Sequence, residues 1–202
     1  MTGKLTVCIV DDDADVRDSL AMLLRRSEYA ILTFDSARAF LAYGIGANSA
    51  CVLADIRMPE MDGLTLQREI NRATPGLPVI IMTGHGDVAM AVQAMKEGAI
   101  DFLEKPFQKA TLIEALKHAF TNREAPPPKA EETTQPSPRK PLTEREQEVF
   151  DLLVQGHQNK VVAYKLGIST RTAEVHRARV MDKLSAKSLA DLVRHSLSRR
   201  PQ

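Results

Sequence analysis

Carboxylates, a hydroxyl and an ammonium follow the short apolar segments in the first half of the sequence. They are Asp11, Asp12 and Asp13 after residues 5–10, Asp55 after 51–54, Thr83 after 78–82, and Lys105 beyond 99–103. Most aspartates in such positions begin a turn or cap the next helix, and this interpretation stays open for Asp55. Asp13 is best placed to cap a helix that begins near Ala14. The competing hypothesis is that the others share one chemical site.

Convergence of these side chains would narrow the chemistry to one kind of site. Two or three carboxylates packed together repel one another unless a cation lies among them. Oxygen ligands without His or Cys favour a hard cation, and they point to Mg²⁺. A lysine and a hydroxyl opposite the metal leave room for a tetrahedral anion. The residue types therefore predict a magnesium site that holds a phosphoryl group.

The segments that carry these residues have the pattern of an α/β domain. Five apolar runs, at residues 5–10, 30–34, 51–54, 78–82 and 99–103, alternate with stretches of helical spacing such as Val16, Leu20, Leu23 and Leu24. This alternation predicts a parallel sheet with helices on both faces. In such a sheet the strands end at one edge, and ligands bind in the crevice outside that edge. The fold would therefore bring the polar residues together.

The charge distribution divides the chain into two modules. Residues 125–139, "APPPKAEETTQPSPR", contain no Val, Ile, Leu or Phe, which predicts an extended linker. Residues 1–124 carry 13 Lys and Arg against 17 Asp and Glu, whereas residues 140–202 carry 12 against 7. An acidic domain joined to a basic one indicates different partners, and the basic domain is expected to face a polyanion.

The compartment is predicted from what the sequence lacks. No apolar run approaches the roughly 20 residues that span a bilayer, and "MTGKLTV" does not have the layout of a secretion signal. Cys8 and Cys51 each lie inside an apolar run, and we interpret both as small core residues in a reducing compartment. We therefore expect a cytoplasmic protein with no membrane partner.

The basic module is predicted to be helical throughout. "TERE" at 143–146 is a capping box, Gly167 ends a short helix that begins near residue 159, and Ser169 can cap a helix over about 170–184. Two helices joined by a tight turn are typical of a helix-turn-helix. A charged helix face is usually only a solvated face, but here the charge is mostly positive, which favours nucleic acid. The expected DNA contacts are Lys160, Arg171, Thr172, His176, Arg177, Arg179 and Lys183.

Four motifs of the acidic module, "VDDDADVRDSL", "ADIRMPEMDG", "IIMTGHGD" and "DFLEKPF", resemble in order and spacing the receiver domain of two-component response regulators. The resemblance covers residues 4–121 and implies a flavodoxin-like, doubly wound sheet. It implies that Asp55 accepts a phosphoryl group from a sensor histidine kinase, and that a cis peptide bond joins Lys105 and Pro106. The implied Mg²⁺ ligands are Asp11, Asp12, Asp55 and the backbone carbonyl of Arg57. The implied phosphoryl-binding and switch residues are Thr83, Lys105 and Phe102, the last of which replaces a frequent Tyr.

The basic module, across residues 141–197, resembles the LuxR-type four-helix DNA-binding domain through "LTEREQEVFDLLVQG", "NKVVAYKLGIS" and "RTAEVHRARVMDKL". The usual Thr-Val pair at the start of the recognition helix is Thr172–Ala173 here. A receiver followed by this domain defines the NarL/FixJ group. The FixJ-type members, to which several stretches are similar, activate nitrogen-fixation and microaerobic genes. This similarity implies promoter DNA, RNA polymerase and a FixL-type haem sensor kinase as partners.

The family's dimer surface would lie on the helix over about 87–97, the fifth strand and the helix over about 109–121. Val88, Met90, Val92 and Met95 give this face more apolar groups than one buried stripe requires, so Val88, Val92 and Met95 are expected to join two phosphorylated receivers.

Two alternatives to a DNA-binding switch can be weighed from the residues. Aspartyl-phosphate phosphatases need an Asp-x-Asp pair followed two residues later by Thr or Val, and here Asp11–Asp13 and Asp13–Asp15 are followed by Asp15 and Arg17. A free-standing enzyme is therefore not expected. The second alternative is a phosphorelay receiver whose C-terminal helices dock a protein, and the sequence leaves it open.

Overall fold

The computed structural model describes residues 4–25, 27–46, 50–84, 88–121 and 141–198. The chain divides into two units, Met1–Pro126 and Pro127–Gln202, and each is described by itself. The predicted linker, residues 125–139, lies outside the described residues, so the boundaries at 124 and 140 stay predictions.

The first unit contains a five-stranded parallel sheet in the order β2-β1-β3-β4-β5. The strands are β1 (Thr6–Val10), β2 (Ala30–Phe34), β3 (Ala50–Asp55), β4 (Val79–Thr83) and β5 (Asp101–Glu104). This order is that of flavodoxin-like folds, which confirms the predicted fold class. Every residue of β3 and β4 is buried, because helices cover both faces of a parallel sheet.

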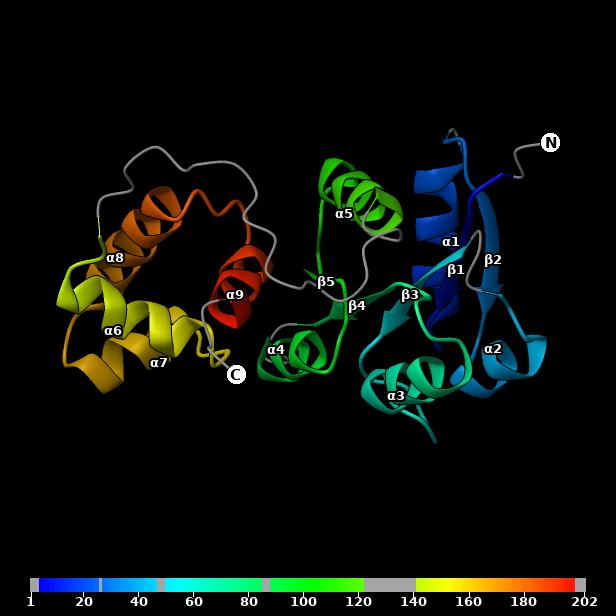
Figure 1. Ribbon diagram of the computed structural model, residues 1–202, viewed down its shortest axis with the longest axis horizontal. Helices are drawn as coiled ribbons and strands as arrows, with labels where there is room; N and C mark the ends of the chain where they lie inside the picture. The colour runs from blue at the N-terminus through cyan, green and yellow to red at the C-terminus, as the bar shows by residue number, and fades with distance from the viewer. Residues whose placement is uncertain (1–3, 26, 47–49, 85–87, 122–140, 199–202) are drawn as a thin grey trace. The chain divides into compact units, whose positions relative to one another are not determined.

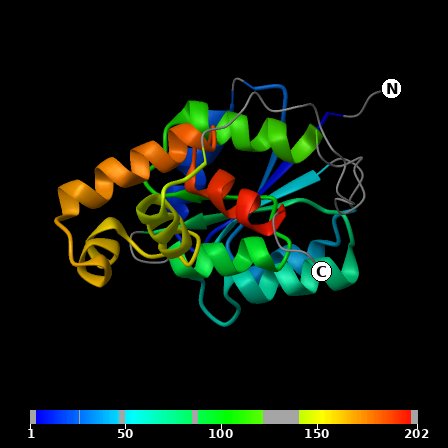
Figure 2. The same cartoon turned by 60° about the vertical axis from the view of Figure 1, so that its left-hand side comes forward.

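Five helices flank this sheet in two layers. They are α1 (Ala14–Leu24), α2 (Ala37–Tyr43), α3 (Gly63–Ala73), α4 (Val88–Lys96) and α5 (Lys109–Thr121). Figure 1 shows α1 and α5 on one face and α2, α3 and α4 on the other, and Figure 2 shows α5 and α4 on opposite sides of the strands. On the first face, Leu20 and Leu24 of α1 and Leu112 and Leu116 of α5 pack with β1 and β3 into one core.

Gly63 explains why the chain breaks soon after Asp55. A Cβ atom at Gly63 would lie 2.4 Å from the backbone oxygen of Asp55, so only glycine allows α3 to begin against the end of β3. The side chain of Asp62 accepts a hydrogen bond from the N–H of Thr65 at 2.7 Å and caps the same helix. The loop between Asp55 and α3 is therefore tightly constrained by backbone packing.

The second unit contains the helices predicted from the sequence. They are α6 (Glu144–Leu153), α7 (Asn159–Leu166), α8 (Thr170–Lys183) and α9 (Leu189–Ser198). Thr143 and Glu146 form the predicted capping box, and the hydroxyl of Ser169 caps α8. Gly167 is left-handed and ends α7, so α7 and α8 form a helix-turn-helix. The described helices include none of the length and apolarity that crossing a membrane requires.

The dimer surface predicted on α4 is corrected by the structure, because its three apolar residues do not reach the protein surface. Val88, Val92 and Met95 are all buried, with Val92 only 1% exposed. They occupy one stripe of α4, which packs against β4, β5 and α3. The outward positions of this helix are Ala89, Gln93 and Lys96. The apolar excess of the sequence therefore fills the core.

Candidate functional site

The register of the sheet places Asp11 beside Asp55. Val10 and Ala54 are partners in the β1–β3 ladder, and each is followed directly by one of the two aspartates. Asp11 is 1% exposed and Asp55 8%. Two acids that lie far apart in the sequence therefore reach the carboxyl edge of the sheet as buried neighbours.

Lys105 connects these two carboxylates. Its Nζ donates a hydrogen bond to Oδ1 of Asp55 at 2.5 Å and another to Oδ2 of Asp11 at 2.8 Å. The backbone supports the lysine, because the N–H of Lys105 donates to the carbonyl of Thr83 at 2.7 Å. The bond between Lys105 and Pro106 is cis, as the resemblance implied. The structure thus brings together Asp11, Asp55 and Lys105.

The charges of this acidic site are unbalanced. Burial raises the pKa of Asp55, and its contacts with Lys105 and with the N–H of Arg57 only partly offset that effect. Burial on its own would lower the pKa of Lys105, but the hydrogen bonds to Asp11 and Asp55 outweigh it, and the pKa of Lys105 is raised. Two buried carboxylates therefore share one firmly protonated ammonium, and a further cation would be stabilised here.

Two backbone N–H groups hold the carboxylates in place, and an arginine holds the backbone of Asp11. The N–H of Arg57 donates to Oδ2 of Asp55 at 2.7 Å, and the N–H of Asp13 donates to Oδ1 of Asp11 at 3.0 Å. The guanidinium of Arg17 donates to the carbonyl oxygen of Asp11 at 2.7 Å. Arg17 was not predicted as a site residue, although its spacing from Asp13 in a capped helix places it one turn above the loop.

The remaining predicted site residues lie near the same edge without joining the ion pairs. Thr83 ends β4 and directly follows Met82, which is paired with Asp55 between β3 and β4. The hydroxyl of Thr83 donates to the carbonyl of Gly84 at 3.3 Å. Phe102 is buried in β5. Asp12 is exposed, and Asp13 caps α1 as predicted. Thr83 and Phe102 thus lie on the two strands that follow β3 in the sheet.

The residues of the acidic site fit a hard cation by their donor chemistry. Asp11, Asp55 and the neighbouring Asp12 supply only oxygen, and the buried pair already holds one cationic group. In the part of the chain that the structure describes, no three His, Cys, Asp or Glu side chains are grouped closely enough to hold a metal. The exposed Asp12 directly follows Asp11 in the chain, next to the buried pair of carboxylates.

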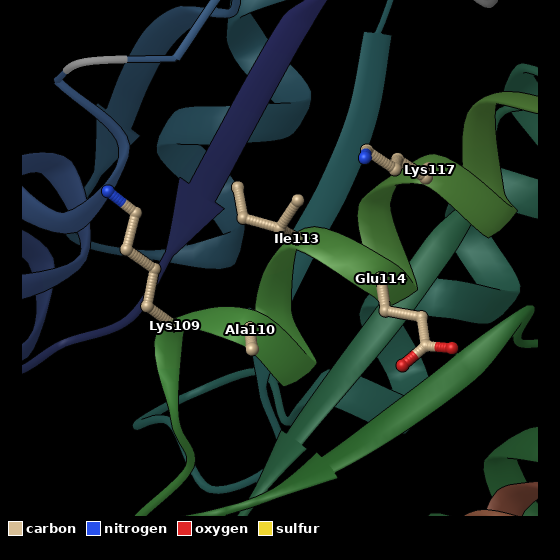
Figure 3. Close-up of a pocket in the computed structure, with 5 residues that line it drawn as sticks. All are labelled: Lys109, Ala110, Ile113, Glu114 and Lys117. Carbon is tan, nitrogen blue, oxygen red and sulfur yellow. The ribbon is translucent and has the colours of Figure 1, made fainter.

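A shallow hollow lies on α5, apart from these carboxylates. Its lining residues, all from one face of the helix, are Lys109, Ala110, Ile113, Glu114 and Lys117 (Figure 3). Lys109 and Lys117 lie on either side of Ile113 in this view. One helix supplies the whole lining, so the hollow is a feature of the outer surface of α5, and neither Asp55 nor Lys105 lines it.

The candidate nucleic-acid interface is the exposed face of α8. Arg171 and Arg179 are exposed on this helix, and Lys160 is exposed on α7. Glu174, Val175 and Ala178 lie on the same outward face, and Val175 is 44% exposed. The positive charge of the helix did not indicate these three residues, since none of them is a cation, but their helical spacing places them beside Arg171. The face offers both charged and apolar contacts.

Lys183 does not belong to that exposed face, and its predicted role as a DNA contact is corrected. Its Nζ donates to Oε2 of Glu146 at 2.6 Å and to the carbonyl of Pro141 at 3.2 Å. Glu146 is only 3% exposed, and the Lys183 ammonium, followed by the N–H of Thr143, lowers the pKa of Glu146 to about 2. Lys183 therefore joins α8 to α6 within the domain.

The other three predicted contacts are half-buried. His176 lies between the buried positions Ala173 and Val180, and Arg177 donates to the side-chain oxygen of Asn159 at 3.3 Å. The hydroxyl of Thr172 lies 2.8 Å from that of Ser169. These side chains flank the outward face of α8, so Arg171 and Arg179 are the better placed of the predicted arginines.

Comparisons with known proteins assign a family to each of the two units. Residues 7–117 match the family described as response regulator receiver domain, and residues 140–196 match bacterial regulatory proteins of the luxR family. The chain is 46% identical to the transcriptional regulatory protein FixJ of Azorhizobium caulinodans over 98% of this chain and 94% of that protein. It is 45% identical to FixJ of Rhizobium meliloti over 96% of this chain and 95% of that protein.

A solved structure gives the same result. The crystal structure of full-length FixJ from B. japonicum has a TM-score of 0.56 and 38% identity, and it covers 98% of both chains. These relatives are transcription regulators rather than free-standing enzymes. The chain belongs to the two-component response regulators of the FixJ/NarL type, which bind DNA through a LuxR-type helix-turn-helix domain.

Proposed function

We propose that this protein is a transcriptional activator that is switched on when a sensor histidine kinase phosphorylates Asp55. The observation that carries the proposal is the buried Asp55 carboxylate at a strand end, with the Lys105 ammonium 2.5 Å from its Oδ1. A nucleophile and a cation in this arrangement suit the transfer of a phosphoryl group, whose charge the cation stabilises. Asp12, Thr83 and Phe102 are the further residues of this proposed switch.

In the proposed transfer, a carboxylate oxygen of Asp55 bonds to phosphorus while the bond from phosphorus to the kinase histidine breaks. Lys105 pairs with an oxygen of the transferred group, and Arg57 N–H keeps the carboxylate oriented. Receiver domains generally use Mg²⁺ for this reaction, and Asp11, Asp12, Asp55 and the Arg57 carbonyl are the groups that would hold it. The metal ion would neutralise charge that gathers between Asp11 and Asp55.

The switch requires Thr83 to change its hydrogen-bond partner. Its hydroxyl donates to Gly84 in the structure, and a phosphoryl oxygen on Asp55 is a stronger, charged acceptor. Movement of Thr83 changes the space beside Phe102 and alters the α4–β5–α5 face. We propose that two phosphorylated receivers then associate through this face, at its outward residues Ala89, Gln93 and Lys96 rather than at the buried stripe.

Receiver association would couple to DNA by mass action. A second DNA-binding domain held close by raises affinity on the order of 10²–10⁴-fold without a new DNA contact. A two-fold dimer reads half-sites about 10 base pairs apart. Each α8 would place Arg171 and Arg179 on phosphates and present Val175 to base edges. Promoter DNA and RNA polymerase are thus the proposed partners of the second unit.

The regulated genes are proposed from similarity alone. The relatives called FixJ are 46% and 45% identical to this chain over nearly all of its length. On that basis, we propose nitrogen-fixation or microaerobic genes as targets and a FixL-type haem kinase as the phosphoryl donor, in the cytoplasm.

A gel-shift titration with and without acetyl phosphate and Mg²⁺ tests the proposal. Duplexes selected from a random pool by the phosphorylated protein serve as the DNA. We expect phosphorylation to tighten binding, and the Asp55→Asn variant to show no such gain. If no DNA is selected while phosphorylation still proceeds, a phosphorelay receiver whose C-terminal helices dock a protein becomes the better account.

A further inference from the structure

Arg17 contacts the acidic site although the proposed chemistry gives it no role. It lies half-buried in the first part of α1, and its Nη1 donates to the carbonyl oxygen of Asp11 at 2.7 Å. The carboxylate of Asp11 is already held by Lys105 at 2.8 Å and by the N–H of Asp13 at 3.0 Å. Arg17 therefore fixes the backbone of a residue whose side chain is fixed separately.

The first turn of α1 holds the other end of this loop. The backbone N–H of Arg17 donates to the carbonyl of Asp13 at 3.1 Å, in the first turn of α1. The side chain of Asp13 caps that turn through the N–H of Asp15 at 2.9 Å. The side chain of Arg17 thus holds the residue before Asp12, and the helix that carries Arg17 holds the residue after it. The exposed Asp12 is the residue between these two anchors.

We propose that Arg17 is a positioning residue that sets where Asp12 presents its carboxylate to Mg²⁺. This inference rests on the proposed magnesium-dependent function. An arginine that acts only through its charge would repel Mg²⁺, so its removal would tighten metal binding. An arginine that positions a ligand has the opposite effect, because loss of a group that orients a metal ligand lowers metal affinity about 10–100-fold. The two roles predict changes of opposite sign.

Calorimetric titration of the full, unphosphorylated chain with MgCl₂ distinguishes the two roles. We expect the Arg17→Met variant to bind Mg²⁺ about tenfold more weakly than the wild type. Arg17→Lys keeps the charge and one donor, so we expect it to recover part of the loss. Arg25→Met is the matched control, since Arg25 is exposed and caps the far end of the same helix, and we expect no change there.

A double variant tests whether the effect passes through Asp12. In the Asp12→Asn background, Arg17→Met should cause no further loss of Mg²⁺ affinity. Circular dichroism establishes that each variant is folded, and if Arg17→Met is not, Arg17→Lys provides the comparison. Unchanged or tighter binding by the folded Arg17 variants, or additive losses in the double variant, would overturn the proposal. Failure of the wild type to bind Mg²⁺ would instead reject the proposed function and remove any ligand for Arg17 to position.

Discussion

The Asp55 carboxylate and the Lys105 ammonium lie 2.5 Å apart, although fifty positions of sequence separate the two residues. Asp55 ends β3, and Lys105 follows β5, so the contact spans the width of β4. Parallel strands deliver both side chains to one edge of the sheet. Asp11, which also bonds Lys105, makes this an arrangement of two acids and one base. The stability of the first unit should therefore depend on the charge of Asp55.

The Asp55→Asn variant should be more stable than the wild type at neutral pH. Burial raises the pKa of Asp55 in the folded protein, so folding favours the protonated acid. Its contribution to the free energy of unfolding is present below the unfolded pKa and is lost as the pH rises through the folded pKa. Thermal melts in EDTA from pH 3 to pH 8 should show the gain only at the higher pH values. The exposed Asp18→Asn serves as control, and equal gains in both variants would contradict this account.

Gly63→Ala should destabilise the first unit by about 1–3 kcal/mol, the usual cost of inserting a group into a packed position. The new Cβ would lie 2.4 Å from the backbone oxygen of Asp55. This clash can be relieved only if the backbone of α3 or of Asp55 shifts. Gly46→Ala is the matched control, because nothing lies within 4 Å of its Cβ. Urea unfolding of both variants is the measurement. Similar midpoints for the two would show that α3 is not held against β3 as described.

Lys183→Met should lower the melting temperature of the second unit without weakening DNA binding below that temperature. The variant leaves the nearly buried Glu146 carboxylate without its ammonium partner. The pKa of Glu146 is lowered to about 2, so the contribution of the pair is present above the unfolded pKa and is lost as the pH falls toward 2. The difference in melting temperature between Lys183→Met and the wild type should therefore shrink as the pH falls toward 2. Arg179→Met, on the exposed face of α8, should leave the melting temperature unchanged.

Alanine at Arg171 or Arg179 should weaken binding to all DNA sequences and lower the salt slope by about one unit each. Both side chains are exposed on α8, where phosphate contacts are available. Val175→Ser should instead change the preferred sequence, with an effect of about 1–3 kcal/mol at one position. Salt titrations and selection from a random duplex pool measure the two effects. If the Val175→Ser protein selects the same sequence as the wild type, Val175 does not read bases.

The sequence was sufficient to predict how the carboxyl edge is built. Apolar runs identified the strands, and the side chains directly after them had to meet at one edge because the strands are parallel. Asp11, Asp55 and Lys105 meet there, and Thr83 ends the neighbouring strand. The capping roles of Asp13 and Thr143 were equally local, since a cap depends only on its own helix.

Long-range side-chain contacts were beyond the sequence pattern. In the sequence, Lys183 is one of several cations on a basic helix. In the structure, its ammonium pairs with Glu146, 37 residues away. Val88, Val92 and Met95 looked like surplus apolar groups because their number does not reveal which faces of α4 are covered. Arg17 had no visible partner, because its acceptor is a backbone carbonyl.

The most direct test of the proposed switch is sedimentation of the full chain with promoter-length DNA, before and after phosphorylation of Asp55. Intact mass spectrometry establishes that the protein carries one phosphoryl group and that Asp55→Asn carries none. We predict that the unphosphorylated protein is monomeric with weak DNA binding, and that the phosphorylated protein sediments as a dimer with affinity on the order of 10²–10⁴-fold higher. A phosphorylated protein that stays monomeric while it binds DNA tightly would contradict control by receiver association.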